Sequence, residues 1–135
     1  MVWKDYKELS VWKTAMALAD ALCGLSEMLP QQASMIAGEM QRAALTVPAS
    51  IAEGYGRGSQ REYYRYLLIA RGTVFALETE VLLCVRRGYL TDAQAEPVLE
   101  LCGTTAQMIS AIAQHSEWSG KTNARTPKTA KEGIA

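Results

Sequence analysis

Four successive segments of this chain repeat apolar residues every three or four positions, a spacing that places them on one side of an α-helix. In the first segment the pattern runs through Leu9, Trp12, Met16, Ala19 and Cys23. No run of alternating apolar and polar residues indicates a β-strand. Helices of similar length joined by short connections pack antiparallel. The sequence therefore predicts an all-α fold, an up-and-down antiparallel four-helix bundle.

Prolines and a serine set the expected limits of the first two helices. The first helix is expected from about Tyr6 to Glu27, because a proline at position 30 drives the residue before it out of the α region. Ser34 is the expected N-cap of the second helix. Pro48 lies inside that helix and removes one backbone donor, but the apolar spacing resumes after it. We therefore expect one continuous, kinked second helix. Its inner side would carry Ile36, Met40, Ala43, Val47 and Ile51.

Glycines and capping residues delimit the last two helices. The glycine-rich segment 54–58 is expected to end the second helix, and Ser59 with Glu62 forms a capping-box pattern that opens the third. The third helix should run to about Arg87, with Gly88 just beyond its end. A second capping-box pattern, at residues 91–94, opens the fourth helix. Its expected inner residues are Val98, Leu101, Thr105, Met108 and Ile112.

Length and composition indicate one globular domain. The chain has 135 residues and a formal net charge of zero, so any attraction to nucleic acid must be local. Because the apolar spacing ends near position 119, we expect residues 1–118 to form the bundle and residues 119–135 a flexible basic tail. Three cysteines within apolar helical patterns are expected to be free thiols. With no signal-peptide pattern and no membrane-spanning run, the expected location is cytoplasmic, without membrane binding.

The third helix has more apolar residues than one inner side requires. Its expected inner side consists of Tyr63, Leu67, Ala70, Val74, Leu77, Val81 and Cys84. Leu68, Phe75 and Leu82 form a second stripe, and Ile69, Ala76 and Leu83 a third. A helix that is apolar on several sides is buried on several sides, either by a second copy of the chain or by its own neighbours. We expect a homo-oligomer, with Leu68, Ile69, Phe75, Leu82 and Leu83 in its interface.

A resemblance to a known family rests on three segments: residues 41–57 (QRAALTVPASIAEGYGR), 66–73 (YLLIARGT) and 77–79 (LET). With the opening segment 6–12 (YKELSVW), these resemble the four-helix bundle proteins encoded in intervening sequences of 23S ribosomal RNA. The resemblance covers about residues 4–115. It implies a bundle with a proline in its second helix and assembly into rings, with five copies the expected number.

The same resemblance connects the chain to nucleic acid. A related bundle family serves as accessory protein to reverse transcriptases of diversity-generating retroelements and presents a basic surface. The family's residues are matched here at Glu53, Gly54, Arg57, Arg71 and Thr79. The chain departs from the family at Ser50, where asparagine is usual, and at Ala76, where glutamate is common.

Arginines and tyrosines gather near the start of the third helix. Arg57, Arg61 and Arg65 recur every four residues, close to Tyr55 and Tyr64. This combination suits phosphate contact and base stacking, and predicts an RNA- or DNA-binding ridge. The alternative is that these arginines pair with nearby carboxylates or are simply solvated.

Glu53 and Arg71 lie among apolar residues, where each would need a partner, so we expect an ion pair between them. The sequence offers no catalytic constellation. His115 is the only histidine, and no spacing of histidines or cysteines is typical of a metal site. We therefore expect a protein that is not an enzyme, has no cofactor, metal or small-molecule substrate, and binds other copies of itself or nucleic acid.

Overall fold

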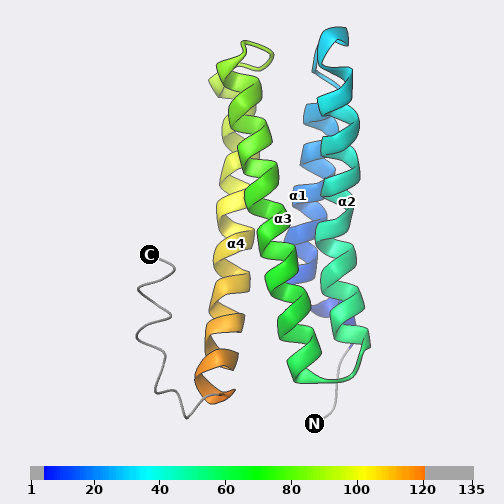
Figure 1. The fold of residues 1–135 in the computed structure, drawn as a ribbon, viewed down its shortest axis with the longest axis vertical. Helices are drawn as coiled ribbons and strands as arrows, with labels where there is room; N and C mark the ends of the chain where they lie inside the picture. Colours follow the sequence, from blue (N-terminus) through cyan, green and yellow to red (C-terminus); the bar gives the residue numbers. More distant parts are fainter. Residues whose placement is uncertain (1–4, 121–135) are drawn as a thin grey trace.

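The computed structural model describes residues 5–120, and the side chains of residues 5–114. This part of the chain forms four α-helices: α1 (Ser10–Ser26), α2 (Ser34–Gly56), α3 (Gln60–Arg86) and α4 (Asp92–Gly120). They run alternately up and down, and the neighbouring pairs are α1–α2, α2–α3, α3–α4 and α4–α1 (Figure 1). The predicted all-α antiparallel four-helix bundle is confirmed.

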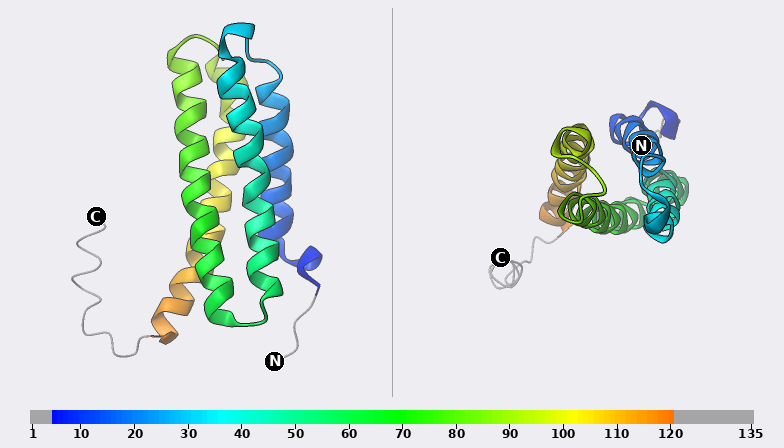
Figure 2. Two further views of the ribbon diagram at one scale, coloured as in Figure 1. Left: turned by 45° about the vertical axis from the view of Figure 1, so that its right-hand side comes forward. Right: turned by 90° about the horizontal axis from the view of Figure 1, so that it is seen from above.

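The bundle has two ends, and each connection lies at one of them. The α2–α3 connection lies at the same end as the start of α1 and the end of α4 (Figure 2). The α1–α2 and α3–α4 connections lie at the opposite end. Because α4 continues to Gly120, it passes the expected domain limit at residue 118. The rest of the expected basic tail lies outside the described residues.

The first helix begins later than predicted. Residues Tyr6–Glu8 form a separate 3-10 helix, η1, because the Asp5 side chain accepts a hydrogen bond from the Lys7 backbone N–H at 2.9 Å. Leu9 is extended and separates η1 from α1. The Tyr6 ring then packs edge-on against Trp12, with centroids 5.4 Å apart.

The buried side of α1 is also one residue away from the predicted stripe. The buried residues of α1 are Val11, Ala15, Leu18, Leu22, Leu25 and Ser26. Of the predicted stripe, Trp12, Ala19 and Cys23 are only half-buried, and Met16 is exposed. The difference corresponds to a rotation of about 100°. It turns the helix's leucines at positions 18, 22 and 25 toward the core.

The second helix is continuous through Pro48, as expected. Ser34 is not its N-cap: it is already helical, and Ala33, at the end of a 3-10 turn over Gln31–Ala33 (η2), stands before it without a side-chain cap. The helix also continues two residues past Gly54. On its inner side Met40, Val47 and Ile51 are buried as predicted, whereas Ile36 and Ala43 are half-buried.

Ser59 and Thr91 cap the starts of α3 and α4, as expected. The Ser59 hydroxyl accepts a hydrogen bond from the Glu62 N–H at 3.2 Å. Thr91 and Gln94 form the complete reciprocal box, with bonds of 2.9 and 3.0 Å. In α3 the predicted inner side is confirmed at all seven positions. Gly88 has a φ of +79°, a left-handed conformation that suits glycine after a helix.

Candidate oligomerisation surface on the third helix

The outer side of α3 exposes large apolar side chains in a single copy of the chain. Ile69, Phe75, Leu82 and Leu83 are 45, 49, 52 and 47% exposed, and Leu68 is half-buried. With Gly72, Ala76 and Thr79 between them, they cover the outward side of the helix from Leu68 to Leu83. We call these eight residues the outer α3 surface.

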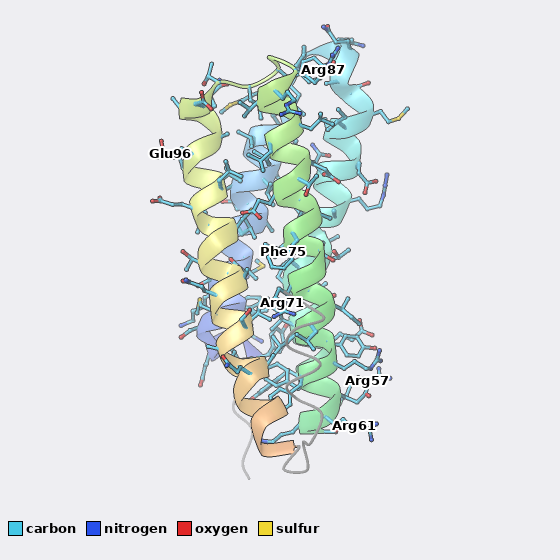
Figure 3. All side chains as sticks on the ribbon, turned by 60° about the vertical axis from the view of Figure 1, so that its left-hand side comes forward. Arg57, Arg61, Arg71, Phe75, Arg87 and Glu96 are labelled. Carbon is cyan, nitrogen blue, oxygen red and sulfur yellow. The ribbon has the colours of Figure 1, made fainter. Side chains whose placement is uncertain are left out.

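The outer α3 surface carries no charge. Between Tyr66 and Val85 the charged residues are Arg71, Glu78 and Glu80, and each belongs to an edge of the helix. The Arg71 guanidinium donates to the Ser110 hydroxyl of α4 at 3.0 Å, between α3 and α4, and lies 6.0 Å from the centroid of the Phe75 ring (Figure 3). Glu78 also faces α4, since its charge adds to burial in raising the pKa of Cys102 to about 12.

Glu80 occupies the opposite edge, in a shallow groove between α2 and α3 that it shares with Glu39 and Arg42. One of its carboxyl oxygens is buried without a hydrogen-bond partner among the described residues. Burial, and then the charge of Glu39, raise the pKa of Glu80. The sequence pattern did not single out this residue, because a glutamate every few positions is ordinary on a helix.

The threonine hydroxyls of this region bond to their own helix. Thr79 donates to the carbonyl of Phe75 at 2.8 Å, and Thr73 to that of Ile69 at 3.3 Å. A hydroxyl that bonds to the carbonyl four residues back is satisfied without water. Polar groups therefore interrupt the apolar character of the surface very little.

A groove between α3 and α4 continues the apolar surface. Its volume is about 540 Å³ and it lies toward the end of α3. It is lined by Thr79, Leu82, Leu83, Val85, Arg86, Asp92 and Leu99. Covering such a surface with another apolar surface releases water and is favourable by roughly 25 cal/mol per Å².

The predicted basic ridge lies at the other end of α3, where Figure 3 shows Arg57 and Arg61 close to the α2–α3 connection. Two of its three arginines share one carboxylate: Arg57 and Arg65 both approach Glu62 at 3.3 Å. The hydrogen bond from Arg65 lowers the pKa of Glu62. Arg61 has no ion pair in the described structure.

Tyr55 and Tyr64, the predicted base-stacking residues, take part in packing. Tyr55 and Tyr63 rings meet edge-on at 5.3 Å, and Tyr63 and Tyr64 rings lie 5.9 Å apart. Both Tyr55 and Tyr64 are half-buried against the core. Tyr63 is buried, which raises its pKa to about 12. The Tyr66 ring lies within 5.3 Å of both the Arg57 and Arg65 guanidinium groups.

The expected ion pair between Glu53 and Arg71 is replaced by other contacts. Glu53 lies 3.9 Å from Arg57 and accepts a hydrogen bond from the Tyr66 hydroxyl at 3.5 Å. Arg71 bonds to Ser110 instead. Next to Glu53, Gly54 of α2 lies at the height of Tyr66 on α3. Arg71 is five residues later, about 8 Å further along the α3 axis, and faces α4.

The described residues include no group of three or more side chains that could hold a metal ion. None of the described helices is long and apolar enough to span a bilayer.

The comparison with known families agrees with the fold. The pattern of the family described as "23S rRNA-intervening sequence protein" matches residues 7–111. No curated protein matches the chain significantly. The family match runs from within η1 to residue 111 of α4, and the resemblance noted in the sequence, over about residues 4–115, extends a few residues beyond it at each end. Since it spans well over half of the chain, this protein belongs to the 23S rRNA-intervening sequence protein family.

Proposed function

We propose that this protein is a homo-oligomeric interaction scaffold without catalytic activity, and that its copies assemble through the outer α3 surface. A ring is the expected form, and five copies is the number that the family resemblance favours. The protein would act by presenting a composite surface that a single copy does not have.

One observation carries the proposal: the outer α3 surface combines four exposed large apolar side chains with no charged residue. Single exposed apolar residues are common on soluble proteins, but contiguous apolar patches mark interaction sites. Here the three charged side chains between Tyr66 and Val85 lie at the edges of α3, and one of them, Arg71, lies 6.0 Å from the centroid of the Phe75 ring.

The size of the surface indicates how much must be covered. From Leu68 to Leu83 the helix advances about 22 Å. A stable interface buries about 800 Å² on each partner, which is more than one side of one helix offers. The contact must therefore include the adjoining groove, where Leu82, Val85 and Leu99 continue the apolar area.

Light scattering coupled to gel filtration tests the proposal on the full chain. We expect one species with a mass several times 14.8 kDa, five times for a pentamer, that persists on dilution. Phe75→Glu should reduce it to the monomer mass, because a charged carboxylate would have to be desolvated in the contact. Phe75→Leu should retain the assembly.

Gln107→Glu is the matched control, since Gln107 is exposed on α4 and is not one of the eight residues of the outer α3 surface. It should assemble like the unmodified chain. A wild-type protein that is monomeric at 14.8 kDa would show that the proposal is wrong.

Nucleic-acid binding is the second candidate function. It is favoured by Arg61, which is exposed at the start of α3 and lacks an ion pair within the described range, next to Arg57. The sharing of Glu62 by Arg57 and Arg65 weakens it. If RNA or DNA binds here, Arg61→Glu should lower affinity and reduce its dependence on salt, as measured by fluorescence anisotropy. Absence of binding at low salt would exclude this candidate.

A further inference from the structure

We propose that the outer α3 surface of one copy packs against the α1–α2 surface of a second copy, around Met16 and Leu45. This inference rests on the proposed function and specifies the second surface of the contact. It follows from where the remaining exposed apolar residues lie, and from the charges around them.

The other exposed large apolar side chains of the described structure all belong to the α1–α2 half. They are Met16, Met28, Met35 and Leu45. Among its described side chains, α4 exposes no large apolar residue. An apolar surface on a neighbouring copy that could cover α3 is therefore available on α1 and α2, and not on α4.

Met16 and Leu45 lie on the same side of the α1–α2 pair. Gln41 donates a hydrogen bond to Ser26 of α1 at 2.9 Å, so its side of α2 faces α1. Leu45 is one turn further along that side and is 66% exposed. Met16 shares the flank of α1 that ends at Ser26 and is 45% exposed. Since α1 and α2 are antiparallel and Gln41 is level with Ser26, the two residues lie about 9 Å apart in height, less than two turns.

Charge disfavours the simplest alternative, a two-fold contact between two α3 helices. The outer α3 surface has arginines without an ion pair in the described structure beyond both of its ends, Arg61 at the start and Arg86 and Arg87 at the finish, whereas Arg65 is paired with Glu62. An antiparallel pair of α3 helices would bring the start of one close to the finish of the other. Arginines would then face arginines at both ends, and like charges repel.

The α1–α2 surface supplies the opposite charge. Asp20 lies one turn after Met16, Glu27 is next to Met28, and one exposed cation, Lys13, lies one turn before Met16. Both acids are exposed, and in the described part of the chain neither forms an ion pair within 4 Å. Because Arg42 is paired with Glu39, the two unpaired acids outnumber Lys13, and this surface complements an apolar surface that ends in arginines.

When two unlike surfaces meet, each copy of the pair keeps one unused surface: the α1–α2 surface on one copy and the outer α3 surface on the other. Such contacts repeat from copy to copy until they close into a ring or continue as a filament. The proposed pairing of surfaces is therefore compatible with a ring, whereas an α3–α3 contact would stop at a dimer.

Two substitutions, one on each surface, test the pairing. Phe75→Glu removes the outer α3 surface and Leu45→Glu removes the α1–α2 surface, both at exposed positions that should leave the fold intact. Circular dichroism should show the same helix content for both variants as for the unmodified chain. Alone, each variant should be monomeric. Mixed in equal amounts, they still share one intact pair of surfaces, and sedimentation should detect a heterodimer of twice the monomer mass at high concentration.

Met35→Glu is the control on α2, because Met35 is exposed but about 15 Å from Leu45 along the helix. It should assemble normally. If Leu45→Glu assembles normally while Phe75→Glu is monomeric, the inference is wrong and the proposed function stands. If the mixed variants fail to associate, the two surfaces do not meet. If neither substitution alters the assembly, both the inference and the role of the outer α3 surface are wrong.

Discussion

Gly54 of α2 packs directly against Tyr66 of α3, so closely that a Cβ at position 54 would overlap the Cβ of Tyr66. The Tyr63 Cα would also lie 3.4 Å from that added atom. Gly54 is buried inside the helix, with no positive φ. Gly54 therefore allows the close approach of two helices near the α2–α3 connection, and the left-handed glycine after α2 is Gly58.

Gly54→Ala should destabilise the protein by about 2 kcal/mol, because overpacking against the base of the Tyr66 side chain outweighs the gain of about 1 kcal/mol in helix propensity. Gly38→Ala is the matched control on the same helix, since an added Cβ there meets no atom within 4 Å. It should stabilise by about 0.5–1 kcal/mol. Urea unfolding at one fixed protein concentration measures both, and shifts in the same direction would contradict this account.

The capping box at the start of α4 makes a second prediction. Thr91→Ala removes a side chain that accepts from the Gln94 N–H at 3.0 Å, and should cost about 1 kcal/mol in the free energy of unfolding. Thr91→Ser keeps the hydroxyl and should retain most of this stability. Thr104→Ala, at an exposed position within α4, should change stability by less than about 0.5 kcal/mol. Equal losses at positions 91 and 104 would mean that the box contributes nothing.

Signals that are local in sequence predicted the fold well. The capping boxes at Ser59 and Thr91, and Gly88 after α3, act within a few residues, so their structural result can be read from the chain. The inner side of α3 was predicted at every position because its seven residues form one unbroken stripe. In α1 two adjacent stripes share the same spacing, and only packing determines which one is central.

In the candidate site, too, some features could be predicted from the sequence and others could not. Surplus apolar residues on α3 were visible in the sequence, and the structure places Ile69, Phe75, Leu82 and Leu83 at its exposed side. The partner of Arg71 was predicted wrongly because it depends on the relative height and rotation of three helices. The sequence does not specify those quantities, so chemically sensible pairs such as Glu53 with Arg71 are easily chosen in error.

Double-mutant cycles test the observed partner of Arg71. Arg71→Ala and Ser110→Ala should show a coupling of about 1 kcal/mol, because their hydrogen bond is partly buried. Arg71→Ala and Glu53→Gln should be additive within about 0.5 kcal/mol, since they share no contact. Thermal unfolding of the single and double variants gives both couplings. A larger coupling to Glu53 than to Ser110 would contradict the described geometry.

The Glu80 carboxyl should give the stability a distinct pH dependence. Burial and the nearby Glu39 raise its pKa in the folded protein, while Arg42, the cation that shares the groove, pairs with Glu39 at 3.1 Å. The folded state therefore binds a proton more readily than the unfolded state does. Between the ordinary value of 4.5 and the raised folded pKa, stability must fall as pH rises.

Glu80→Gln removes this titration and keeps the shape of the side chain. It should raise the free energy of unfolding at neutral pH by up to about 1 kcal/mol, since the amide carries no charge to desolvate. The advantage should shrink as pH falls toward 4.5, where Glu80 becomes protonated in both states. Glu96→Gln, at an exposed position on α4, provides the comparison for an ordinary surface carboxyl. Urea unfolding at a series of pH values decides the matter: an advantage that grows toward acid pH would mean that Glu80 is stabilised as the carboxylate, by a contact that compensates for its burial.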